Sequence, residues 1–550
     1  MSFVIVVNFV VHLSSADEVH DLDPVALVQN RLREGGALED GQVVLDGDPA
    51  WIDPQPGEQF DHRERLIELV RVAVERDMHC GKSICSGLPP VSLDRAAILD
   101  RFQRTRARTR ALFGLIDESA YLQKPIPLRN PVVFYEGHLP AFAVNTLIRQ
   151  GLGEPGIDRS LETVFARGID PEEEAAAHAR GNPVWPDRAA VIRYADDADR
   201  RVEEAILHGD LERTDRPLLR NAEALWTIIE HEEMHQETLA YMWHQIPSRL
   251  KRRPAHYVTA PPRLRTDEVR AAQVRVPAGR ATLGTTTHRP PSNTHDPTPT
   301  THHPPPAPQF AWDNERPEHG VSVGAFDVDV HKVTNGRFMR FVEKGGYADP
   351  RWWRGEDWAW VVAERIAHPS FWRLENGTWF WRGMFEEVRL PESWPVYVTW
   401  AEARAYARWA GQRLMSEAEF HRAAYGTPSG DERLFPWGDD LPRRAPSNFD
   451  FLRWDPDPVD AHPSAASAFG VHDLVGNGWE WTSDVFAPFA GFAPMASYPE
   501  YSADFFDGAH YVMKGASPVT ARGLVRRGFR NWFRPRYPYV YATFRCVRPA

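Results

Sequence analysis

The chain of 550 residues has an ordinary globular composition, 42% hydrophobic and 25% charged, which excludes a disordered or fibrous protein. Its 76 acidic residues exceed its 64 basic residues, so the net charge of -12 gives no support to nucleic-acid binding. Three cysteines are too few for a disulfide scaffold. Because the sequence has neither an apolar run long enough to span a bilayer nor a signal-peptide pattern, we expect a cytoplasmic protein without a membrane partner.

The first half of the chain divides into two regions. Residues 1–95 form a variable, acidic N-terminal region without a clear pattern. From about Ser92 onward apolar residues recur at intervals of three and four, which predicts a first helix beginning there and three more around 131–152, 186–208 and 216–245. We assign residues 96–250 to this helical domain. Four amphipathic helices predict a helical bundle, whose core is a usual place for a metal site built from facing helices.

The second half of the chain has a different character. Residues 251–275 are basic and contain proline, which predicts a linker. From 276 to 550 short strand-like runs, glycine turns and many tryptophans indicate a loop-rich α+β or β domain with an aromatic core. Inside this domain, the Pro/Thr/His-rich segment near 285–308 has too few large apolar residues to bury a core, and we expect a disordered insertion there.

Two histidines form the strongest local signal. His231 and His235 are four residues apart, so on a helix both imidazoles lie on the same face. The same stripe carries the apolar residues Ile228, Leu239 and Met242. A buried imidazole must be hydrogen-bonded or must bind a metal, because burying it without a partner costs a few kcal/mol.

A third histidine lies in an earlier predicted helix. His138 stands between Phe134 and Phe142 at steps of four, again on an apolar stripe. Three neutral imidazoles would leave open positions on an ion, and they suit Fe(II), Zn or Cu alike. Glu237 would face away from such an ion and orient a ligand or cap a neighbour from behind.

The letters at 231–235 also fit the HExxH pattern of zinc proteases. That pattern would make Glu232 a general base and requires a third ligand downstream. No matching downstream motif follows, and Glu232 falls off the stripe that carries the histidines. The upstream His138 is therefore the favoured third ligand.

The motifs together resemble the ergothioneine-type sulfoxide synthases, the EgtB family. Gly137-His138 and His231-x3-His235-x-Glu237 resemble its DinB-like domain. Residues 275–550 resemble the formylglycine-generating-enzyme fold at Trp312–Glu315, Val333–Gly336, Gly411–Glu417, Gly476–Trp481 and Phe544–Arg545. The resemblance implies an N-terminal DinB-like four-helix bundle followed by an α+β formylglycine-generating-enzyme or C-type-lectin-like domain.

The resemblance also implies a chemistry. In that family three histidines hold a non-haem Fe(II), which makes His138, His231 and His235 the expected metal ligands. The chain would then be an iron(II)-dependent oxidoreductase that uses O2 to join a thiol sulfur to C2 of the imidazole ring of hercynine (N-α-trimethylhistidine), giving a sulfoxide. Placing both reactants at one ion turns their encounter into an intramolecular step.

The C-terminal domain is expected to complete the substrate pocket. By the resemblance, Asn531 and Trp532 would contact hercynine, with Arg530 and Phe533 beside them. An indole is suited to hold a trimethylammonium group. Tyr501 is the candidate catalytic tyrosine, as a proton donor near the iron.

The expected thiol substrate follows from a position at which this sequence departs from the family pattern. Phe533 stands where members that use γ-glutamylcysteine carry an acid. The segments Phe134–Pro140, Phe165–Asp170 and Arg530–Tyr539 resemble the fungal-type enzymes, without their fused methyltransferase. This implies cysteine rather than γ-glutamylcysteine as the sulfur donor, with hercynine supplied by another protein.

Three kinds of alternative remain: a related activity on another substrate, a formylglycine generator and a non-catalytic binding protein. Related enzymes form 5-histidylcysteine sulfoxide from histidine (the OvoA type) or a C–Se bond to hercynine (selenoneine synthases). A formylglycine generator needs a cysteine pair, whereas Cys546 is the only cysteine in the C-terminal domain. A non-catalytic lectin-like binding protein is also compatible with the fold, because fold does not fix function.

Overall fold

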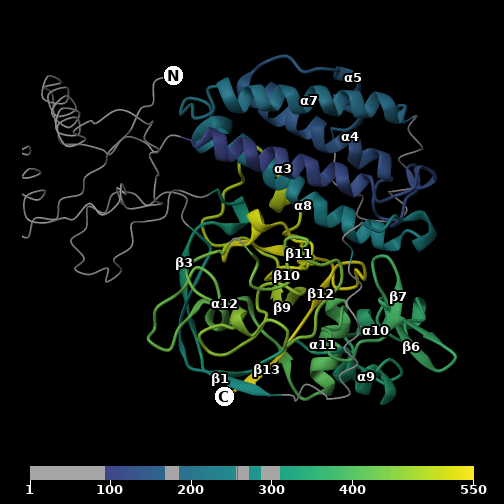
Figure 1. Cartoon of the computed structure of the whole chain (residues 1–550). Helices are drawn as coiled ribbons and strands as arrows, with labels where there is room; N and C mark the ends of the chain where they lie inside the picture. The colour runs from purple at the N-terminus through teal and green to yellow at the C-terminus, as the bar shows by residue number, and fades with distance from the viewer. Residues whose placement is uncertain (1–92, 167–184, 255–256, 258–271, 286–309, 443) are drawn as a thin grey trace, which may run out of the picture. The chain divides into compact units, whose positions relative to one another are not determined.

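The computed structural model describes residues 93–166, 185–254, 257, 272–285, 310–442 and 444–550 (Figure 1). Nearly all of the N-terminal region predicted at 1–95, most of the linker predicted at 251–275 and nearly all of the insertion predicted near 285–308 therefore lie outside the described residues. The chain from Leu93 to Ala550 belongs to one compact unit, and the description below concerns that unit.

The predicted helices of the N-terminal half are present. They are α3 (Arg95–Phe113), α4 (Val132–Ala143), α7 (Arg188–His208) and α8 (Glu223–Gln245), with a short α5 (Arg159–Val164) between them. Single 3₁₀ turns occur at Glu118–Ala120 and Ser248–Leu250, and Pro217–Ala222 contains 3₁₀ turns with a kink at Arg220 and Asn221. Asp94 caps α3, because its carboxylate accepts the N–H of Ala97 at 3.0 Å.

The helix predicted at 131–152 changes type along its length. α4 contains Pro140 and continues directly into a π-helix, Val144–Leu152. Proline lacks the N–H that would close a helical hydrogen bond. The π-helix ends at Gly153, whose φ of 75° is in the left-handed region that glycine readily adopts.

These helices form a bundle with its own core. α4 packs on α7, and α3 packs on both α7 and α8. Phe102, Leu147, Val202 and Leu225 belong to one buried apolar cluster between them. The structure thus confirms the predicted helical bundle.

The C-terminal half mixes strands and helices. Within the described residues the strands form four small sheets, ordered β1-β4-β13-β8, β11-β10-β9-β12, β2-β3 and β5-β6-β7. Their bounds are β1 (Gln273–Val276), β2 (Gly279–Leu283), β3 (His319–Val323), β4 (Phe326–Asp329), β5 (Trp372–Glu375), β6 (Thr378–Arg382), β7 (Glu387–Arg389), β8 (Arg413–Leu414), β9 (Trp479–Val485), β10 (Tyr511–Lys514), β11 (Asn531–Phe533), β12 (Ala542–Thr543) and β13 (Cys546–Pro549).

Helices and long loops connect these strands. The helices are α9 (Asn335–Glu343), α10 (Gly355–Ala363), α11 (Trp400–Trp409), α12 (Glu417–Tyr425) and α13 (Glu500–Ala503). α11 and α12 both begin with a capping box, Thr399 with Glu402 and Ser416 with Glu419. The α+β character predicted for this half is confirmed.

One sheet brings the C-terminal half to the bundle. β10 pairs antiparallel with β9 and β11, so that Val512 lies opposite Trp532. Figure 1 shows β11 on the side of this sheet that faces α8. Leu239 and Trp243 of α8 share a continuous buried cluster with Trp479 and Tyr541, so α8 is packed against both halves.

Among the described residues, no helix has the combination of length and apolar character that crossing a bilayer requires.

Candidate metal centre

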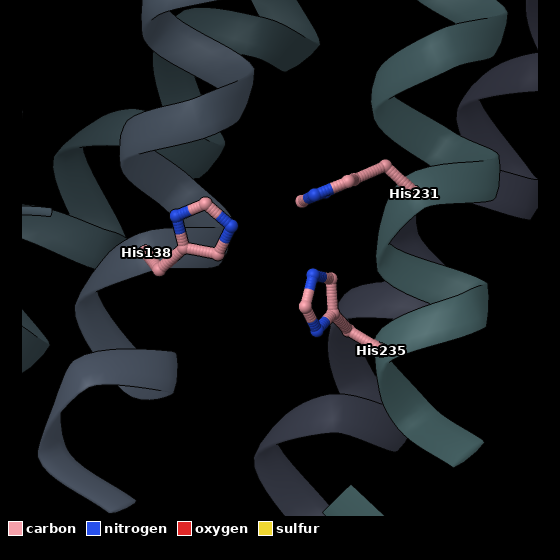
Figure 2. Close-up of side chains that lie close together, drawn as sticks. All are labelled: His138, His231 and His235. Atoms are coloured by element: carbon pink, nitrogen blue, oxygen red, sulfur yellow. The ribbon is translucent and has the colours of Figure 1, made fainter. Parts of the chain in front are cut away.

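The three predicted ligands lie together between two helices. His138 comes from α4, and His231 and His235 come from successive turns of α8. One potential ligand atom from each residue lies within 4.8 Å of the other two. Figure 2 shows the three rings converging on a common space. Among the described residues this is the only group of three or more such side chains close enough to hold a metal ion.

The backbone fixes the orientation of His138. Its Nδ1 lies 2.8 Å from the carbonyl oxygen of Phe165, which can only accept, so Nδ1 carries the proton. Nε2 is then the lone-pair nitrogen, and it is buried without a hydrogen-bond partner among the described residues. A buried nitrogen of this kind is what a metal ligand presents before the ion binds.

Aromatic side chains of α4 surround the histidines. Phe134 stacks on His138, with ring centroids 4.9 Å apart. Phe142 stacks on His231 at 3.7 Å, and Tyr135 lies 5.7 Å from His235. These rings restrict the rotation of the imidazoles and exclude water from one side of the site.

The surroundings keep the imidazoles neutral. Burial lowers the pKa of His138 to about 4, against the opposing effect of its hydrogen bond to Phe165. Burial and then the neighbouring histidines lower the pKa of His231 well below its usual value. The pKa of His235 is lowered in the same way, with a further contribution from Arg129. Neutral imidazole is the form that binds metal, so the three residues fit a divalent ion.

The acidic residues of α8 are buried but point elsewhere. Glu232 pairs with Arg106 of α3 at 2.7 Å, and Glu233 pairs with Arg101 of the same helix at 2.7 Å. The carboxylate of Glu232 is therefore occupied by an arginine. This leaves the zinc-protease alternative without a free general base at that position.

Glu237 faces away from the histidines, as expected. Its carboxylate accepts hydrogen bonds from Trp479 Nε1 at 2.7 Å, Ser517 Oγ at 2.7 Å and Thr520 Oγ1 at 2.8 Å. All three donors belong to the C-terminal half. Glu237 therefore joins the helix that carries two of the histidines to the β9 and β10 region.

Trp532 and Tyr501 lie next to each other beside the bundle. The indole of Trp532 stacks on Phe486 at 4.1 Å, and its edge meets the ring of Tyr501 at 5.2 Å. The hydroxyl of Tyr501 lies 3.1 Å from the sulfur of Met234, the residue before His235. Asn531 is half-buried, and its side-chain oxygen accepts the backbone N–H of Trp532 at 2.9 Å.

Phe533 and Arg530 have different surroundings. Phe533 stacks on Tyr537 at 5.1 Å and meets Tyr241 of α8 edge-on at 6.2 Å. Arg530 is 3% exposed and donates to both oxygens of Glu417, and also to the carbonyl oxygens of Asn314 and Ala487. These contacts hold the guanidinium inside the C-terminal half.

Tyr498 is a site residue that spacing alone does not single out. Its ring centroid lies 6.0 Å from that of His231 and 5.3 Å from that of Phe142. It also lies 5.7 Å from Tyr501, three residues later in the chain. The short tyrosine pair at 498 and 501 is the only local signal, and it does not reveal which ring meets the histidines.

Comparisons with known proteins match both halves of the chain. The DinB superfamily matches residues 101–239, and the sulfatase-modifying factor enzyme 1-like domain matches residues 260–550. Hercynine oxygenase of Mycolicibacterium smegmatis is 31% identical over 459 residues, covering 82% of this chain and 99% of that protein. Hercynine oxygenase of Mycolicibacterium thermoresistibile is 41% identical over 246 residues, covering 43% and 54%. Ergothioneine biosynthesis protein 1 of Neurospora crassa is 26% identical over 515 residues, covering 79% and 55%.

Proposed function

The chain belongs to the hercynine oxygenase family, and we propose from this that it joins the sulfur of a thiol oxidatively to the imidazole ring of hercynine in ergothioneine biosynthesis. The observation that carries the proposal is the convergence of three neutral histidines, two buried and one half-buried, between α4 and α8 in a member of that family.

Fe(II) is the proposed cofactor, with His138, His231 and His235 as its ligands. Bound Fe(II) would supply the redox chemistry needed for reaction with O2. Imidazole ligands alone suit several metals, but zinc has no redox chemistry to offer an oxygenase. The stacking of Phe134 and Phe142 on two of the rings would hold the ligands in place before the ion arrives.

The C-terminal half is proposed to bind hercynine and supply a proton. Trp532 and Asn531 lie on the edge strand β11, where an indole can hold a quaternary ammonium group. Burial raises the pKa of Tyr501 well above its usual value, so its hydroxyl keeps the proton at neutral pH. That hydroxyl lies against Met234, beside His235, and is our candidate proton donor.

Cysteine is the proposed sulfur donor. Phe533 offers an apolar ring packed on Tyr537 where members that use γ-glutamylcysteine carry an acid. The test is anaerobic reconstitution with Fe(II), then oxygen with hercynine and either cysteine or γ-glutamylcysteine, read by mass spectrometry. We expect the cysteine sulfoxide conjugate of hercynine. Replacing hercynine by histidine, or the thiol by a selenium donor, tests the two related activities, and no oxygen uptake with any combination would favour a non-catalytic binding protein.

The ligand assignment makes a separate prediction. His235→Ala removes one of the three imidazoles, so we expect both bound iron and product to fall below detection, measured by metal analysis and mass spectrometry. His208→Ala is the matched control, because its ring is exposed at the end of α7 and should leave both values unchanged. A His235→Ala protein that still binds one iron and turns over would exclude this residue as a ligand.

A further inference from the structure

The last residues of β11 separate two environments. Successive side chains of a strand point to opposite faces. Trp532 lies with Phe486 and Tyr501, whereas Phe533 lies with Tyr537 and Tyr241. A reaction between two small molecules at one centre needs two such subsites, and the two faces of β11 provide different chemistry for them.

The face with Phe533 carries a positive charge. Arg129 lies shortly before α4, which begins at Val132. Its Nη2 donates to the hydroxyl of Tyr241 at 2.7 Å, and its Nε donates to the hydroxyl of Tyr537 at 3.1 Å. Its Cζ lies 5.5 Å and 5.7 Å from the centroids of the same two rings. The two phenols therefore orient a half-buried guanidinium, and the same two rings also contact Phe533.

The same guanidinium contacts the helix that carries two of the histidines. Tyr241, which Arg129 contacts, is on α8 six residues beyond His235. Arg129 thus contacts α8 on the C-terminal side of His235, while Tyr498 and Phe142 lie against His231.

The two proposed reactants differ in the charge that they bring. Hercynine carries a fixed trimethylammonium group, which a guanidinium repels and an indole attracts. An amino-acid thiol carries a carboxylate, which a guanidinium binds by strong, charge-assisted hydrogen bonds. An apolar Phe533, packed on the same two tyrosine rings, also avoids the repulsion that an acidic side chain would exert on that carboxylate.

We propose that Arg129, oriented by Tyr241 and Tyr537, binds the carboxylate of the thiol substrate and so selects a free α-amino-acid thiol, while the Trp532 face takes the cationic end of hercynine. The proposal deepens the function proposed above and rests on it. It makes Arg129 a residue that determines specificity for the sulfur donor.

The experiment compares cysteine with cysteamine, which has the same thiol but no carboxylate. In the iron-loaded protein, Arg129→Gln should raise the KM for cysteine roughly 10-fold to 100-fold, because a hydrogen bond to a charged group is lost. The KM for hercynine and the turnover of cysteamine should each stay within about two-fold. Arg129→Lys, which keeps a point charge, should fall between wild type and Arg129→Gln.

Two further measurements complete the test. Arg253→Gln is the matched control, an exposed arginine that also lies over a tyrosine ring, and it should leave every constant unchanged. Anaerobic calorimetry of cysteine and cysteamine binding to the iron-loaded protein gives a readout that does not need turnover. There the preference for cysteine should be present in wild type and absent in Arg129→Gln.

Each other outcome has a definite meaning. An equal loss with both thiols, or a raised KM for hercynine instead of cysteine, would overturn the assignment of Arg129. Equal calorimetric affinity of the wild-type protein for both thiols would overturn it as well. If the wild-type protein binds cysteine in preference to cysteamine but forms no conjugate with hercynine, the proposed function fails while the carboxylate site stands.

Discussion

Two tyrosines three residues apart occupy different positions at the site. The ring of Tyr498 lies against Phe142 and His231, whereas Tyr501 packs on Trp312 at 4.0 Å and directs its hydroxyl to Met234. Both are half-buried. A tyrosine donates a proton through its hydroxyl, so the position of the hydroxyl, and not that of the ring, decides which tyrosine can act as the donor.

We predict that the hydroxyl of Tyr501 contributes to turnover. Tyr501→Phe keeps the ring packed on Trp312 but removes the proton, so turnover should fall about 10²-fold, the lower range for loss of a general acid. Iron content should not change. Tyr498→Phe is the comparison on the same segment, and we expect a smaller loss; the reverse order would move the proton-donating role to Tyr498. Steady-state rates of conjugate formation decide between them.

Helix α8 lines the metal site with one face and packs against the rest of the protein with its other faces. His231 and His235 line the site, while Glu230, Glu232 and Glu233 are buried on other sides of the same helix. Helical spacing predicts the shared face of the histidines. It does not predict buried carboxylates, because their partners Arg101 and Arg106 lie more than 120 residues earlier in the chain.

The sequence also does not show which side chains of the C-terminal half face the site. Motif order indicates that the segment at 530–533 lies near the histidines, and contacts of Phe533 with α8 agree. Arg530 and Phe533 are three residues apart, yet the arginine is enclosed by Glu417 and the phenylalanine meets the bundle. A three-residue strand gives too short a pattern for the sequence to show which side chains face inward.

One buried ion-pair network links α8 to the C-terminal half. Arg526 donates to Glu230 at 2.9 Å and to Glu315 at 2.9 Å, and Trp312 Nε1 also donates to Glu230 at 2.9 Å. Burial alone would lower the pKa of Arg526, but the charges of Glu230 and Glu315 raise it above its usual value. The arginine is therefore charged, and it compensates two buried carboxylates, one of which, Glu230, directly precedes His231.

Removing this arginine should destabilise the protein strongly. Arg526→Ala leaves Glu315 buried without its cation and leaves Glu230 with the more distant Arg101, 3.6 Å away, and breaking such a buried pair typically costs about 3–5 kcal/mol of unfolding free energy. Arg548→Ala removes an exposed arginine paired with Asp327 and should cost about 1 kcal/mol or less. Denaturant unfolding monitored by tryptophan fluorescence measures both. Equal costs for the two variants would contradict the compensating role of Arg526.

The C-terminal end of α8 also joins the two halves of the chain. His244 Nε2 lies 2.7 Å from the carbonyl oxygen of Arg382, and its Nδ1 lies 3.1 Å from the hydroxyl of Tyr541. Burial, followed by the charge of Lys251, lowers the pKa of His244 to about 3. The folded protein thus holds this imidazole neutral at the junction of the two halves.

This histidine should make the protein less stable in acid. In the unfolded chain a histidine binds its proton near pH 6.5, whereas folded His244 does so only near its lowered pKa, so stability is lost as pH falls below about 6.5. Between pH 7.5 and 5.5 this one group should remove about 1.4 kcal/mol of unfolding free energy. His244→Gln, whose amide can still donate to the Arg382 carbonyl, should show a pH dependence shallower by that amount. Denaturant unfolding at the two pH values measures it, with exposed His208→Gln as the control. An unchanged slope in His244→Gln would show that the folded protein binds a proton on His244 as readily as the unfolded chain does.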